Sequence, residues 1–72
     1  MMTYMLNEKG IFRLTESGVF WKTVIWQRIP DDGYSSINHN ITIKEMKKLF
    51  EPEGYIFSNN LQSLLAMREL ID

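Results

Sequence analysis

The chain has 72 residues, of which 44% are hydrophobic and 24% are charged, and its formal net charge is −1. This composition is typical of one small folded domain and not of a disordered tail. The chain contains no cysteine and one histidine, which excludes disulfides and thiolate metal sites and argues against a structural zinc ion. We therefore expect a single domain over residues 1–72 that needs no metal and no cofactor.

Targeting signals are also missing from the sequence. No apolar run approaches the roughly 18 residues that a membrane span needs, and the opening segment MMTYMLNEKG lacks the basic and apolar regions of a signal peptide. Absence of cysteine fits a reducing compartment. We expect a cytoplasmic protein that has no membrane partner.

The first predicted element is a β-hairpin over residues 4–14. Asn7 and Gly10 bracket a turn, and apolar residues flank that turn on both sides. A glycine at position 10 suits the positive φ angle that closes such a loop.

Residues 18–28 carry two conflicting signals. Their valine, phenylalanine, tryptophan and isoleucine side chains favour a strand by propensity, but their apolar positions do not alternate cleanly. On a helix they form one stripe, which favours a helix that ends before Pro30. We prefer the helix and leave the strand open; in the helix, Trp21 points into the core. The apolar stripe consists of Phe20, Trp21, Val24, Ile25 and Ile29.

Two further helices are predicted after the polar loop PDDGYSSINHN. The first covers residues 42–50, where Thr42 and Glu45 have the spacing of a capping box and Pro52 ends the helix. The second covers residues 59–68, with Ser58 or Asn59 as its cap. The side chains expected to be buried together are Leu49, Phe50, Leu61, Leu64 and Leu65.

Taken in order, residues 17–71 resemble the core of winged-helix, helix-turn-helix transcription regulators. The segment ITIKEMKKLF resembles the second helix of that family, SNNLQSLLAMREL resembles the recognition helix, and ELI resembles its exit. The resemblance implies an α+β fold, with an N-terminal β-hairpin followed by a three-helix, helix-turn-helix core. It also implies a small DNA-binding transcription regulator of the type found in phages and mobile elements, acting as a dimer.

The residues that would contact DNA come from the last two helices. Asparagine, glutamine and serine at the start of a recognition helix can read base edges, and lysines on the preceding helix can contact phosphates. The candidate DNA-binding residues are Lys44, Lys47, Lys48, Asn59, Asn60, Gln62 and Ser63. A solvent-exposed helix face without DNA contacts is the alternative for both groups.

A second function remains open, namely a protein-binding module that acts as an adaptor or inhibitor. Such a module would use an apolar patch near Trp26 and Tyr34, or the free edge of the hairpin. The balanced charge of the chain favours this function, whereas the order of helices and caps favours DNA binding. The only histidine, His39, lies in a polar loop that cannot hold a catalytic geometry, so we expect no enzymatic activity.

Overall fold

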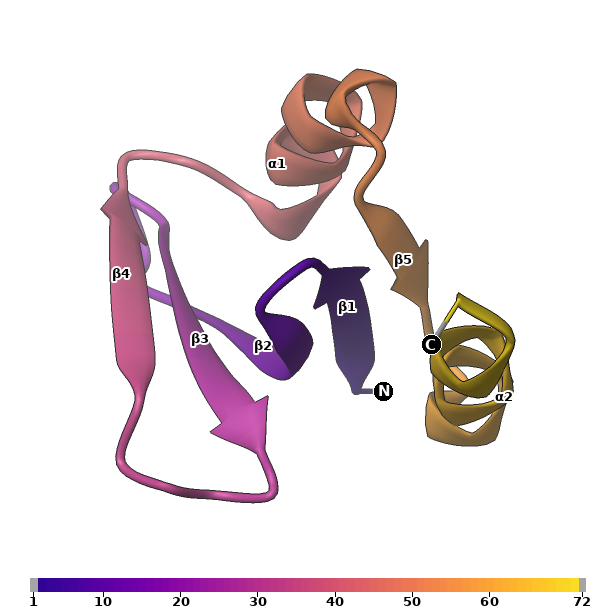
Figure 1. Ribbon diagram of the computed structural model, residues 1–72. Helices are drawn as coiled ribbons and strands as arrows, with labels where there is room; N and C mark the ends of the chain where they lie inside the picture. The colour runs from indigo at the N-terminus through magenta and orange to yellow at the C-terminus, as the bar shows by residue number, and fades with distance from the viewer. Residues whose placement is uncertain (1, 72) are drawn as a thin grey trace.

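The computed structural model describes residues 2–71, which form a five-stranded antiparallel sheet and two α-helices (Figure 1). The strand order is β4-β3-β2-β1-β5. No helix within the described residues is long and apolar enough to cross a membrane. The elements are β1 (Thr3–Asn7), β2 (Gly10–Ser17), β3 (Thr23–Ile29), β4 (Ser35–His39), α1 (Ile43–Phe50), the 3-10 turn η1 (Glu51–Glu53), β5 (Ile56–Ser58) and α2 (Leu61–Ile71).

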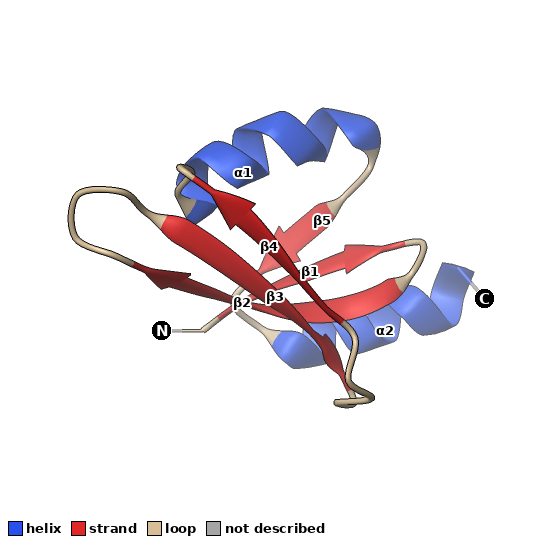
Figure 2. Cartoon of the chain, turned by 90° about the vertical axis from the view of Figure 1, so that its left-hand side faces the viewer, coloured by secondary structure: helices blue, strands red, loops and turns tan. Residues whose placement is uncertain are grey.

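The two helices cover opposite faces of the sheet (Figure 2). Successive residues of a strand point to opposite faces, and the neighbours Met5 and Leu6 in β1 show this division. Met5 packs in a cluster with Met46 of α1, whereas Leu6 packs with Leu64 of α2. The chain therefore has two small cores, one on each side of the sheet.

The first hairpin lies where the sequence predicts it, with β1 pairing with β2 from Thr3↔Leu14 to Asn7↔Gly10. The turn is held by Asn7, whose Oδ1 accepts a hydrogen bond of 2.8 Å from the backbone N–H of Lys9. Gly10 has a φ of +128°, which a side chain would disfavour. This hairpin supplies most of the buried side chains of both cores.

The helix predicted over residues 18–28 is wrong, because residues 23–29 form β3. This strand pairs with β2 and with β4, so it lies inside the sheet. Val24 is buried on the side of α1, while Ile25 points to the other face. An internal strand with apolar residues on both faces produces consecutive apolar positions that imitate a helical stripe. Propensity was the better guide for this segment.

The three-helix, helix-turn-helix core, and with it the winged-helix architecture, is also contradicted. Only two α-helices occur among the described residues, and the segment between them is not a turn. It contains β5, which pairs with β1 through Tyr4↔Ser58, Met5↔Phe57 and Leu6↔Ile56. This strand carries the chain from one face of the sheet to the other, so α1 and α2 do not pack as a recognition pair.

The helix termini agree with the local sequence signals at the start of α1 but not at α2. The capping box is confirmed: the Thr42 hydroxyl accepts a hydrogen bond from the Glu45 N–H at 3.1 Å, and the Glu45 carboxylate accepts one from the Thr42 N–H at 3.2 Å. At the start of α2 the predicted cap, Ser58 or Asn59, is wrong: Asn60 Oδ1 accepts a hydrogen bond of 3.0 Å from the Gln62 N–H. The helix predicted over residues 59–68 is observed at 61–71.

The prediction of a single core is wrong in two ways: one of its five residues is exposed, and the other four are divided between two separate cores. Leu64 is fully buried, but Leu49 is 61% exposed. Phe50 packs on the side of α1, whereas Leu61 and Leu65 pack with Leu64 on the side of α2. The pattern along each helix identified its apolar face, but it could not show that the two faces are on opposite sides of a sheet.

Candidate interaction surface at the hairpin tip

The connection between β2 and β3, residues 18–22, is named here the hairpin tip. Gly18 has a φ of +105°, and a Cβ at this position would lie 2.2 Å from the carbonyl oxygen of Trp21. Only glycine fits this geometry without a shift of the backbone. The Lys22 ammonium group donates a hydrogen bond of 2.8 Å to the Gly18 carbonyl oxygen, which closes the loop across its base.

Three consecutive large apolar side chains project from the hairpin tip. Val19 is 84% exposed, Phe20 is 90% exposed and Trp21 is 75% exposed. Single exposed apolar residues are ordinary on protein surfaces, but three adjacent ones at the end of a hairpin form a continuous patch, and such patches mark interaction sites. Figure 2 shows that the tip extends beyond the rest of the sheet.

Two hydrogen bonds fix the base of the tip to the segment that begins α1, one from the β2 side of the hairpin and one from the β3 side. On the β2 side, Glu16 Oε1 accepts a hydrogen bond of 2.8 Å from the backbone N–H of Ile43, in the first turn of α1. On the β3 side, the backbone N–H of Ile41 donates to the carbonyl oxygen of Lys22 at 3.0 Å. A carboxylate at a helix N-terminus is favoured by the helix dipole. These hydrogen bonds hold the hairpin tip, and with it the apolar patch, in a fixed position relative to α1.

A shallow hollow of about 200 Å³ lies between the tip and the start of α1. Phe20 and Trp21 form its apolar side, and the capping residues Thr42 and Glu45 form its polar side. The charged side chains around it, Lys22 and Glu45, have opposite signs. The surface at the tip is thus apolar at its centre and mixed in charge at its margin, an arrangement typical of protein–protein interfaces.

A charged cluster lies at the opposite end of β3. The Arg28 guanidinium lies 2.8 Å from the Asp32 carboxylate and 4.5 Å from the centre of the Tyr34 ring. Its hydrogen bond, followed by the backbone N–H of Tyr34, holds the pKa of Asp32 below the usual value of 3.8. This cluster closes the β3–β4 loop, at the end of β3 opposite the hairpin tip.

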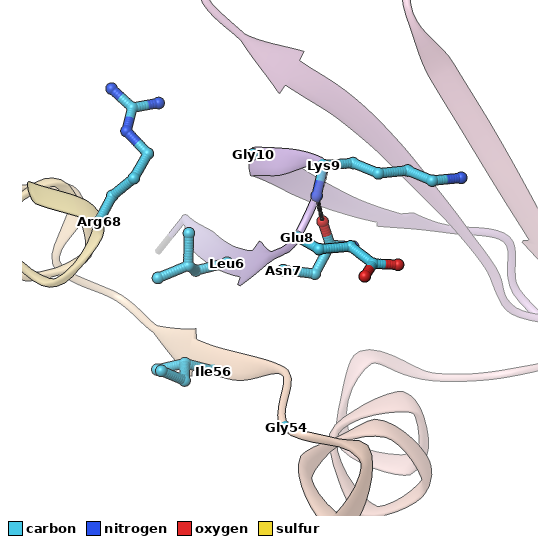
Figure 3. Close-up of a pocket in the computed structure, with 8 residues that line it drawn as sticks. All are labelled: Leu6, Asn7, Glu8, Lys9, Gly10, Gly54, Ile56 and Arg68. Carbon is cyan, nitrogen blue, oxygen red and sulfur yellow. Dashed lines mark hydrogen bonds between the residues drawn. The ribbon is translucent and has the colours of Figure 1, made fainter. Parts of the chain in front are cut away.

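A surface depression of about 460 Å³ lies beside the β1–β2 turn (Figure 3). Leu6 and Ile56 contribute apolar surface, and Arg68 of α2 extends on one side of it. The side chains of Glu8 and Lys9 point away from Arg68. These charged side chains do not converge on one point. None of the described residues forms a group of ligands suited to a metal ion.

The candidate DNA-binding residues form two separate exposed groups. Lys44, Lys47 and Lys48 lie on α1, above one face of the sheet. The other group lies at the start of α2 below the opposite face, and it consists of Asn59, Asn60, Gln62 and Ser63. Two of these four serve local structure, since Asn60 caps α2 and the Thr3 hydroxyl bonds to Asn59. The two groups therefore lie on opposite sides of the sheet.

Trp26 and Tyr34, the candidate interface residues, are half-buried among other aromatic side chains. The Trp26 ring meets Phe12 edge-on, with 5.7 Å between ring centres, and its Nε1 donates a hydrogen bond of 2.8 Å to Asn38 Oδ1. Tyr34 packs against Phe12 at 5.7 Å. Most of the surface of both rings is therefore used within the chain.

The residues of the hairpin tip were missed by the sequence interpretation. Trp21 was predicted to point into the core, but it is 75% exposed. One signal could have located the tip: Gly18 stands between two segments of high strand propensity, and a glycine in that position often marks a hairpin loop. Large apolar residues are rare in such loops, so composition pointed the other way.

Comparisons with protein families, with curated protein sequences and with solved structures found no match to this chain. Its function is therefore inferred from the geometry of its own residues.

Proposed function

We propose that the protein is a cytoplasmic protein-binding module that inserts its hairpin tip into an apolar pocket of a partner protein. The proposal rests on one observation, the exposure of Val19, Phe20 and Trp21 side by side at the tip. Tryptophan is enriched among the residues that dominate binding energy, because a large rigid ring buries much surface at a small entropic cost. The partner pocket should be apolar and should offer a hydrogen-bond acceptor to the indole N–H.

The support beneath the tip strengthens this proposal. Binding costs less free energy when the contacting loop is already ordered, and the bonds from Ile41 and Ile43 tie both strands of the hairpin to α1. The charges near the tip also favour a protein over a membrane surface. Lys22 and Glu45, of opposite charge, line the same hollow, whereas attachment to anionic lipid requires a cluster of basic residues.

The test compares a tip variant with controls that remove equally exposed apolar groups elsewhere. The tip variant is Phe20→Ser with Trp21→Ser, and the controls are Leu49→Ser on α1 and Leu70→Ser on α2, which are 61% and 88% exposed in the native chain. Candidate partners are captured from the source cells, purified, and titrated against each variant. We expect the tip variant to weaken binding of a purified partner at least about tenfold, and both controls to leave it unchanged.

A second readout follows the tip directly. In a Trp26→Phe background, Trp21 is the only tryptophan, and its emission should shift to the blue when the partner encloses it. Purified partners whose binding is unaffected by the tip variant would overturn the proposal. Binding of the tip to anionic phosphatidylglycerol vesicles, with no partner protein that depends on the tip, would overturn it in favour of a membrane surface.

A further inference from the structure

The outer edge of β4 is a free sheet edge. Within residues 2–71, β4 pairs only with β3, and no described element lies along its other side (Figure 1). Natural proteins protect such edges with lysine, proline, a bulge or a very short strand, because unpaired backbone groups invite another strand. The opposite edge follows this rule, since β5 has three residues. The sequence of β4, SSINH, has five residues without lysine or proline, and its register with β3 is continuous.

The backbone groups available at this edge follow from the pairing with β3. Arg28 donates its N–H to the Tyr34 carbonyl oxygen at 3.2 Å, so these two residues form a hydrogen-bonded pair. Bonded and non-bonded pairs alternate along an antiparallel ladder. The register then directs the N–H and C=O groups of Ser36 and Asn38 toward β3, and those of Ser35, Ile37 and His39 toward the free edge.

We propose that β4 pairs with β4 of a second copy of this chain, antiparallel and centred on Ile37, to form a symmetric dimer with one continuous sheet. In this register Ile37 faces Ile37 of the second copy, and Ser35 faces His39. Every outward residue then opposes another outward residue, so each such pair can exchange both of its backbone hydrogen bonds. A shift by one residue would place outward groups opposite inward ones and remove these bonds.

The side chains fit the same symmetry. Ser35, Ile37 and His39 are exposed on the sheet face that α2 covers mainly beside β1, β2 and β5. Ile37 is 53% exposed, and its cross-strand neighbour Ile25 is 37% exposed. Pairing at the two-fold axis would join these residues to their copies in one apolar stripe across both sheets, and cross-strand apolar pairs stabilise sheets. A symmetric contact also closes on itself, so association stops at the dimer.

The dimer has a consequence for the hairpin tip. The tip lies at the end of the sheet where Thr23 pairs with His39, and antiparallel pairing places the two His39 ends on opposite sides of the two-fold axis. Two tips would therefore point away from each other and bind two partner molecules. This consequence rests on the proposed function, whereas the association of the two strands does not.

The test measures mass and backbone amide signals as a function of concentration. Sedimentation velocity from about 10 µM to about 1 mM, the range of weak association, should show a shift from 8.5 kDa to twice that mass. Over the same range, the amides of Ser35, Ile37 and His39 should gain protection from hydrogen exchange. The amides of Ser36 and Asn38 should be protected throughout, because they already bond to β3.

Ile37→Lys should weaken the association at least tenfold, since it places two like charges at the two-fold axis. The matched control is Leu49→Lys, which adds the same charge at a residue 61% exposed on α1 and should leave the association unchanged. A circular dichroism melt of each variant checks that it folds. A monomer throughout the concentration range would overturn the proposal. So would concentration-dependent amide shifts confined to residues 19–21, which would indicate contact through the tips.

Discussion

The replacement Leu64→Ala tests whether α2 is held to the sheet by one buried side chain. Leu64 is fully buried against Leu6 and Ile11, while its helical neighbours Leu61 and Leu65 are only partly buried. Removing a buried leucine side chain costs about 2–5 kcal/mol. A folded chain of this length has a total stability of about 4–11 kcal/mol at the usual value per residue. The replacement should therefore remove a large part of the stability of the whole domain.

Urea denaturation followed by circular dichroism and tryptophan fluorescence measures this loss. With a dependence of about 1 kcal/mol per molar urea for a small protein, the midpoint should fall by about 2 M or more. The matched control is Leu49→Ala, which makes the same change in a helix at a residue that is 61% exposed. It should change the stability by less than about 0.5 kcal/mol. Equal shifts in the two variants would refute the burial of Leu64 against the sheet.

Three further predictions test the loops at the two ends of β3. Gly18→Ala should destabilise the domain by about 1–3 kcal/mol, because its Cβ would meet a backbone oxygen at 2.2 Å; a chemical denaturation curve unchanged from the native one would contradict this. In a Trp26→Phe variant, acrylamide should quench Trp21 nearly as well as free indole, since Trp21 is 75% exposed; strong shielding in the monomer would place it in the core. A nuclear magnetic resonance titration should give Asp32 a pKa below 3.8, and Arg28→Gln should raise it. Because the folded-state pKa is depressed, the contribution of Asp32 to stability is present above about pH 4 and is lost as the pH falls through the folded value.

Local chemistry in the sequence correctly predicted the first turn and the start of α1. Thr42 and Glu45 form the capping box that their spacing predicts, and the turn beside Asn7 and Gly10 joins two paired strands. These features depend on residues within a few positions of one another. A hydrogen bond between near neighbours is available in almost any tertiary context, so a short sequence is enough to predict it.

The architecture depended on contacts between distant residues, and the sequence pattern led to the wrong one. Residues 18–28 have the apolar spacing of a helix, but β3 is stabilised by β2 on one side and β4 on the other. The segment between the two helices resembled a turn, yet residues 56–58 pair with β1, more than forty positions earlier in the chain. Pairing partners of this kind set which face each side chain occupies, and no local pattern contains that information.

For the candidate surfaces, too, some features could be predicted from the sequence and others depended on the tertiary structure. Sequence alone identified residue types suited to an interface and a nearly balanced net charge of −1, and it correctly placed Leu64 on a buried face. Only the tertiary structure decided that Trp21 is exposed whereas Trp26 lies among aromatic rings, and that β4 is left with a free edge. Exposure of an apolar side chain is decided by what the rest of the chain packs against it, and that depends on the whole fold.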